Sequence, residues 1–73
     1  PSTKIKFALP KSGNTSLIVY NIFGEKIRTL IQLYLEAGIH EIDFSADELS
    51  SGVYLYALQF DGKQEMKKMI LQK

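Results

Sequence analysis

The side chains that could do chemistry in this sequence are few, and their spacing matches no catalytic or metal-binding pattern. The single histidine, His40, excludes any site that needs two imidazoles, and the absence of cysteine excludes disulfides and thiolate metal sites. The acidic residues lack the spacing of a calcium-binding loop. Ser50 and Ser51 precede Gly52 without the Gly-x-Ser-x-Gly motif of a hydrolase nucleophile. We therefore expect no enzymatic activity, no cofactor and no bound metal.

Composition and charge describe a small globular chain. Its 73 residues are 45% hydrophobic and 23% charged, with nine Lys and Arg against eight Asp and Glu. The resulting net charge of +1 is too balanced for the broad basic surface that binds nucleic acid. No apolar run approaches the roughly 20 residues of a membrane helix. We expect a single domain over residues 1–73, which must bury most of its large apolar side chains.

Apolar and polar residues alternate with a period of two along most of the chain, which predicts an all-β fold. Strands are expected at residues 4–9, 17–20, 25–31, 33–35, 38–44, 53–60 and 63–71. Turn formers separate the first three at 10–14 and 21–24, where Gly24 should supply a positive φ. The polar segment after residue 44 could form a short helical turn around 46–49. About seven short strands joined by turns are typical of an antiparallel β-sandwich.

Asp61 and Gly62 stand between the last two expected strands and predict a tight hairpin, because both central residues of a type I′ turn need a positive φ. This turn pairs Phe60 with Lys63 and fixes every pair further out. One face of the hairpin then carries Tyr54, Tyr56, Leu58, Met69 and Leu71. The other face carries Val53, Leu55, Ala57, Met66 and Ile70, interrupted by Lys68.

Tyr54 stands just inside a strand, after a bend that contains Leu49 and Gly52. This is the layout of a tyrosine corner, in which the phenol donates a hydrogen bond to the upstream backbone and fixes a crossover between sheets. We therefore expect Tyr54 to be buried and to have a structural role.

If Tyr54 points inward, the opposite face of the hairpin is an apolar surface patch. Its expected members, with the neighbouring strand included, are Ile18, Val53, Leu55, Met66 and Ile70. Monomers rarely expose such patches, so we treat this one as a candidate interface, including one between copies of the chain. A β-bulge that shifts the register, or a terminal segment that covers the patch, is the structural alternative.

Four segments of the chain carry motifs of a known family: residues 1–10 (PSTKIKFALP), 19–24 (VYNIFG), 49–54 (LSSGVY) and 67–71 (KKMIL). Together they resemble the C-terminal sorting domains of the type IX secretion system, which are similar to the immunoglobulin-like domain of the flagellar hook-cap protein. They follow the order and spacing of the family over essentially the whole chain. The resemblance implies an immunoglobulin-like antiparallel β-sandwich of about seven strands.

The resemblance also implies a non-catalytic signal that follows an upstream cargo domain in a Gram-negative bacterium. It implies export across the outer membrane by a translocon with its shuttle, and attachment of the cargo to the cell surface by a sortase-like transpeptidase. Carried over by motif, the recognition residues would be Gly52, Tyr54, Lys67, Lys68 and Lys73. Ile18 departs from the family, which often has a polar residue there.

Two adjacent lysines of the last strand, Lys67 and Lys68, must face opposite sides of the sheet. They either protect an open edge against unwanted pairing or contact a receptor that pairs with the strand, and the sequence leaves both roles open. Two other functions also remain. The two-faced hairpin would suit a structural subunit that self-assembles into surface filaments. A carbohydrate-binding module is less favoured, because the chain has no Trp for a sugar platform.

Overall fold

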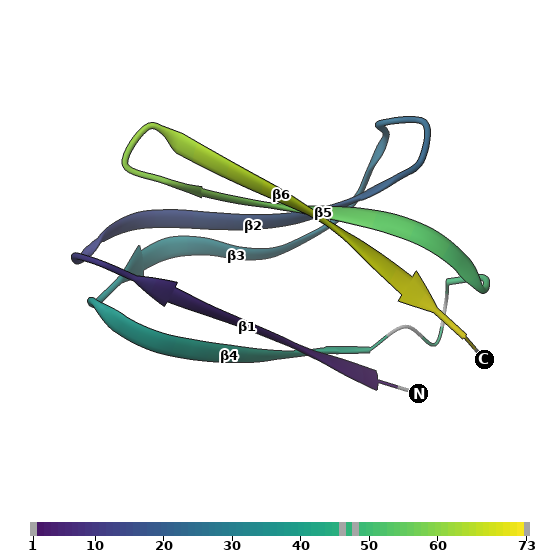
Figure 1. The fold of residues 1–73 in the computed structure, drawn as a ribbon, viewed down its shortest axis with the longest axis horizontal. Helices are drawn as coiled ribbons and strands as arrows, with labels where there is room; N and C mark the ends of the chain where they lie inside the picture. Colours follow the sequence, from purple (N-terminus) through teal and green to yellow (C-terminus); the bar gives the residue numbers. More distant parts are fainter. Residues whose placement is uncertain (1, 46, 48, 73) are drawn as a thin grey trace.

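A computed structural model of the chain describes residues 2–45, 47 and 49–72, which form two antiparallel β-sheets packed face to face (Figure 1). The strands are β1 (Ser2–Leu9), β2 (Gly13–Asn21), β3 (Lys26–Leu35), β4 (Gly38–Ser45), β5 (Gly52–Phe60) and β6 (Lys63–Leu71). Strands β1 and β4 form a two-stranded sheet, here the small sheet. Strands β3, β2, β5 and β6, in that order, form the large sheet. The predicted all-β sandwich is confirmed.

The expected number of strands was wrong, because six strands rather than about seven are present in the described residues. The two segments expected at 25–31 and 33–35 are one strand, β3. Its register against β2 shifts between Leu17 and Ile18 and again between Val19 and Tyr20. The first shift leaves the successive residues Leu30 and Ile31 both packed against the core. Two adjacent inward residues interrupt the alternation from which the sequence pattern was derived.

The core lies between the two sheets and is built from the alternate residues that the sequence pattern places inward. Its largest fully buried side chains are Leu17 and Val19 from the large sheet and Phe44 from the small sheet. Arg28 reaches over the ring of Phe44, with its guanidinium carbon 5.2 Å from the ring centroid, and donates a hydrogen bond of 2.8 Å to the carbonyl of Ser45. These contacts fasten β3 to the end of β4.

The turns follow the expected backbone chemistry. Asp61 and Gly62 have φ angles of 53° and 74°, and the pairing of β5 with β6 runs from Phe60–Lys63 to Gly52–Leu71 without a shift. Gly24 has a φ of 83° in the turn after β2, where the Asn21 side chain accepts hydrogen bonds from two backbone N–H groups. Both turn predictions and the predicted hairpin register are confirmed.

Two smaller expectations concern the loop before β2 and the segment before β5. The loop expected at 10–14 is shorter, because β2 already begins at Gly13, where the ring of Phe60 packs so closely that an added Cβ would lie 2.9 Å from it. The helical turn expected around residues 46–49 involves Ala46 and Glu48, which lie outside the described residues. Within the described part of the chain, no helix is long and apolar enough to cross a membrane.

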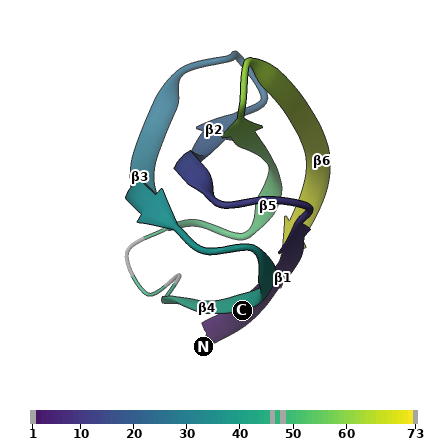
Figure 2. The same ribbon diagram turned by 90° about the vertical axis from the view of Figure 1, so that its left-hand side faces the viewer.

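Figure 2 shows how the sandwich closes differently on its two sides. On one side β3 passes directly into β4, so the two sheets are joined by the chain itself. On the other side lie β1 and β6, which within the described residues are free edges of the small and the large sheet and form no ladder with each other. The end of β6 lies near the start of β1, and the two strands diverge toward the β5–β6 hairpin in both views.

Candidate sorting surface

The tyrosine corner is formed as the sequence predicts. Tyr54 is 7% exposed, and its hydroxyl donates a hydrogen bond of 2.8 Å to the backbone carbonyl of Ser50. The ring packs in the core cluster with Val19 and Leu71. The corner therefore connects three places: the bend before β5, the middle of the large sheet and the last residue of β6.

The backbone conformation at position 52 favours glycine. Its φ of 153° lies in a region that residues with a Cβ rarely adopt, while an added Cβ would meet no atom within 4 Å. The constraint is thus conformational rather than steric. Gly52 pairs with Leu71, the last residue of β6, so this conformation lies where the β5–β6 ladder ends.

Strand β6 presents its lysines on opposite sides, as expected from their adjacency. Lys67 is opposite Tyr56 on the inward-facing side, and Lys68 is opposite Leu55 on the outer side. Both lysine side chains are exposed, as is every residue from 63 to 68. Met69 and Leu71 are the residues of β6 that reach the core. Lys73 lies outside the described residues. The structure therefore brings Gly52 and Tyr54 together with the end of β6, while the two lysines stand on separate surfaces.

The outer face of the large sheet carries the predicted apolar patch. Val53, Met66 and Ile70 are 40%, 50% and 59% exposed, whereas Ile18 and Leu55 are half-buried. The register makes these residues neighbours, since Val53 pairs with Ile70 and Leu55 lies between Tyr20 and Lys68. We call this set the outer patch: Ile18, Val53, Leu55, Met66 and Ile70.

Ala57, which was expected on the apolar outer face, faces outward but is only 1% exposed. It lies between Ile18 and Met66 in one cross-strand row, and the larger neighbours shield its single methyl group. The hairpin register is unshifted, so the β-bulge proposed as an alternative explanation of the patch does not occur there.

A polar row crosses the same outer face and was missed by the sequence analysis. It contains Gln32, Ser16, Gln59 and Gln64, one from each strand of the large sheet. The Ser16 hydroxyl donates to Gln59 at 3.2 Å, and the Gln59 amide donates to Gln64 at 2.7 Å. No local motif predicts this row, because it depends on the registers of three strand pairs.

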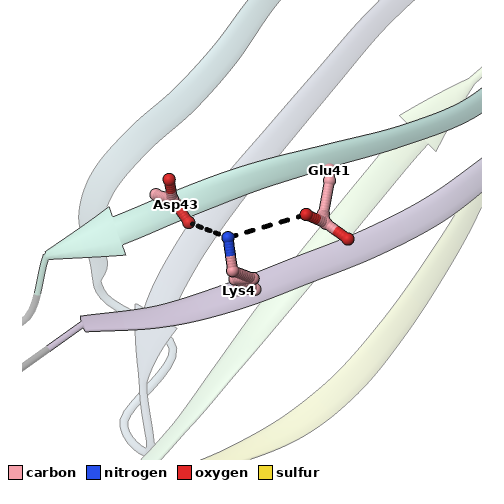
Figure 3. A network of polar contacts seen from close by, with 3 residues as sticks. All are labelled: Lys4, Glu41 and Asp43. Carbon is pink, nitrogen blue, oxygen red and sulfur yellow. Dashed lines mark hydrogen bonds and ion pairs between the residues drawn. The ribbon is translucent and has the colours of Figure 1, made fainter.

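The outer face of the small sheet is charged instead (Figure 3). The Lys4 Nζ lies 3.1 Å from Asp43 Oδ1 and 3.6 Å from Glu41 Oε1. The hydrogen bond to Asp43, followed by the charges of Asp43 and Glu41, raises the pKa of Lys4 above its usual 10.5. Lys4 thus forms ion pairs with two acidic residues of the same face.

His40 makes structural contacts with Phe7 and with the backbone of Glu36. Its ring stacks on Phe7 with the centroids 5.5 Å apart, and its Nε2 lies 2.7 Å from the carbonyl oxygen of Glu36. Among the described residues, no group of three or more His, Asp or Glu side chains could hold a metal ion.

The architecture defines a class of protein: a small antiparallel β-sandwich whose last strand closes against a tyrosine corner. A family model described as "Secretion system C-terminal sorting domain" matches residues 2–72. The chain belongs to this family and is a C-terminal sorting signal for cargo of the type IX secretion system.

Membership also defines the general role of the domain. The secretion machinery recognises it, it is attached to an upstream cargo domain, and it directs export across the outer membrane to the cell surface or the medium. Searches of curated proteins and of solved structures found no match. The likeness to the immunoglobulin-like hook-cap domain therefore stays a prediction, and no comparison supports a filament-forming subunit.

Proposed function

We propose that the secretion machinery reads β6 together with the corner that anchors it. The observation that carries this proposal is that β6, the last strand of the described residues, has one edge without a ladder among them and ends against Gly52 and Tyr54. A free edge offers unpaired backbone groups that a receptor strand can bind. In this proposal Gly52 and Tyr54 hold the strand in place, while Lys67, Lys68 and Lys73 supply the charged contacts.

The partners in this proposal are the outer-membrane translocon with its shuttle, and a sortase-like transpeptidase that attaches the cargo at the cell surface. The domain itself is non-catalytic. The absence of a nucleophile motif and the structural surroundings of His40 support this part of the proposal.

The outer patch is the second element of the proposal, as a contact surface between copies of the chain. Light scattering of the 73-residue chain over a range of concentrations tests it. A dimer that forms with rising concentration and is lost in Met66→Lys would support this role. A monomer at every concentration would assign the patch to cargo or machinery instead.

Deleting residues 69–73 from a cargo protein that carries this domain tests the main proposal. We expect the cargo to accumulate in the periplasm. Leu71→Ala is the matched control, because it weakens the packing at the end of β6 while the strand backbone and both lysines remain. Export of the Leu71→Ala cargo but not of the truncated cargo is the expected result. Normal export of the truncated cargo would contradict the proposal.

A further inference from the structure

The seam between β1 and β6 contains a crevice that the known role of the domain does not explain. The crevice has a volume of about 330 Å³. Its walls and rim include Lys6, Phe7, Tyr56, Leu58, Glu65 and Lys67, contributed by β1, β5 and β6. Its floor is apolar, because Leu17, Leu58 and Tyr56 reach it from the core side of the large sheet.

The crevice exists because a sheet of two strands faces a sheet of four. Strand β6 bends away from β1 toward the hairpin (Figure 1). The inward face of its first half is therefore not covered by β1 or β4. Glu65 and Lys67 occupy inward-facing positions of this half, opposite Leu58 and Tyr56, yet both are exposed. One more strand beside β1 would cover these positions.

Strand β1 can accept such a strand. It pairs with β4 along one edge, from Ser2–Ser45 to Leu9–Gly38, and its other edge has no ladder within the described residues. A strand added there would extend the small sheet to three strands and lie over the inward faces of β5 and β6. A strand added to the free edge of β6 would instead extend the large sheet past the crevice and leave it open.

The charged residues at the rim of the crevice favour one kind of incoming strand. Lys6 and Lys67 stand on the two sides of the crevice, with Glu65 the single acid among its lining residues. A basic edge discourages pairing with another basic strand and favours an acidic one. The volume is at the small end of ligand pockets, which suits one large apolar side chain rather than a cofactor.

We propose that the free edge of β1 is an acceptor for an extended peptide segment of a partner protein. In this arrangement the segment adds a third strand to the small sheet and inserts one apolar side chain into the crevice. Acidic residues next to that side chain point to the outer face, toward Lys6, and acidic residues two positions away point inward, toward Lys67. This is strand addition with a side-chain pocket that gives selectivity. The proposal differs from recognition of β6 during export, since the incoming strand pairs with the edge of the other sheet; the two proposals share only Lys67.

The test uses the 73-residue chain and a capped synthetic peptide of about nine residues with alternating valine and threonine, the length of a typical strand. The peptide has a central phenylalanine, with aspartates at the first and second positions on each side of it. Heteronuclear NMR titration should shift the backbone signals of residues 6–8 and of Leu58 and Lys67. Shifts confined to β3 or to the outer patch would overturn the proposal, and so would the absence of any shift.

Two variants with a matched control sharpen the test. Lys67→Glu should weaken peptide binding about fivefold or more, because it reverses a rim charge. Lys68→Glu makes the same change of net charge on the outer face and should leave binding unchanged. Leu58→Trp, which fills the crevice, should abolish binding while circular dichroism shows a folded β protein. Equal weakening by Lys67→Glu and Lys68→Glu would contradict the proposal.

Sedimentation of the chain without peptide tests whether the edge of β1 binds a second copy of the chain instead. Any self-association through the outer patch should be unchanged by Leu58→Trp. Self-association that Leu58→Trp abolishes would assign the edge of β1 to another copy of this chain and overturn the proposal of a separate partner.

Discussion

The outer faces of the two sheets follow the same alternating pattern but have opposite chemistry. The small sheet presents lysines and carboxylates that pair with one another, whereas the large sheet presents Ile18, Met66 and Ile70. In an antiparallel sandwich, the face away from the core is ordinarily polar. The small sheet obeys this rule. The large sheet breaks it over part of its surface, and we propose that this part contacts another molecule.

The sharpest contrast is between the two faces of β2. Leu17 is fully buried, so Leu17→Ala should destabilise the fold by about 2–5 kcal/mol through lost burial and a cavity. Its neighbour Ile18 is half-buried on the outer face, and Ile18→Ala should cost only about 1 kcal/mol. Urea denaturation of both variants measures the difference. Equal costs would mean that the outer face is packed as well as the core.

The corner should be sensitive to a change that removes no contact. Gly52→Ala places a Cβ on a backbone with a φ of 153°, and the strain should cost roughly 1–3 kcal/mol. Gly24→Ala is an informative comparison, because its φ of 83° also favours glycine but its turn does not anchor β6. We expect both variants to unfold at lower urea concentration, with faster hydrogen exchange at Leu71 only for Gly52→Ala. Unchanged exchange there would separate Gly52 from the end of β6.

Removing the hydroxyl of Tyr54 should reduce stability less, and it tests a single hydrogen bond. Tyr54→Phe keeps the ring in the core and removes the donor to Ser50, so it should cost about 1 kcal/mol. Tyr20→Phe, at a half-buried position of the outer face, is the control. Thermal unfolding of both variants checks the comparison, and a larger loss from Tyr20→Phe would contradict the role given to the corner.

Breaking the outer patch should change association more than stability. Met66 is half exposed, so Met66→Lys should alter the free energy of unfolding by less than about 0.5 kcal/mol. Binding of a hydrophobic fluorescent dye should nevertheless fall. Ile39→Lys is the matched control, because Ile39 is exposed on the outer face of the small sheet, opposite Ala8 and outside the outer patch. Equal dye loss in both variants would remove the distinction between the faces.

The charged face of the small sheet should give the smallest effect. The pKa of Lys4 is raised in the folded state, so its contribution to stability is complete below the unfolded value of 10.5 and is lost as the pH rises through the higher folded value. Lys4→Met should be slightly less stable than wild type at neutral pH, and the difference should vanish in strong alkali. Lys6→Met, with the same change of charge on the same face, is the control. A difference that grows with pH would contradict this sign.

The sequence predicted most of the fold because its strongest features are local. The Asp61–Gly62 turn determined the register of β5 with β6, and the bend before Tyr54 predicted the corner. The strand count was wrong because the bulges in the β2–β3 ladder are consequences of packing and leave no local mark. Recognition of the family came from four motifs and is confirmed by the family match.

Features that depend on several strands could not be predicted in the same way. The burial of Ala57 and the polar row from Gln32 to Gln64 follow from the order of strands in the large sheet. The crevice depends on how β6 diverges from β1, which no single segment encodes.

Export of a cargo protein in which Lys67 and Lys68 are both replaced by Gln tests the central claim most directly. Neither side chain is part of the core, so the domain should stay folded and any loss of export reports recognition. The account predicts folded cargo retained in the periplasm. Cargo that reaches the cell surface at the wild-type level would contradict the account.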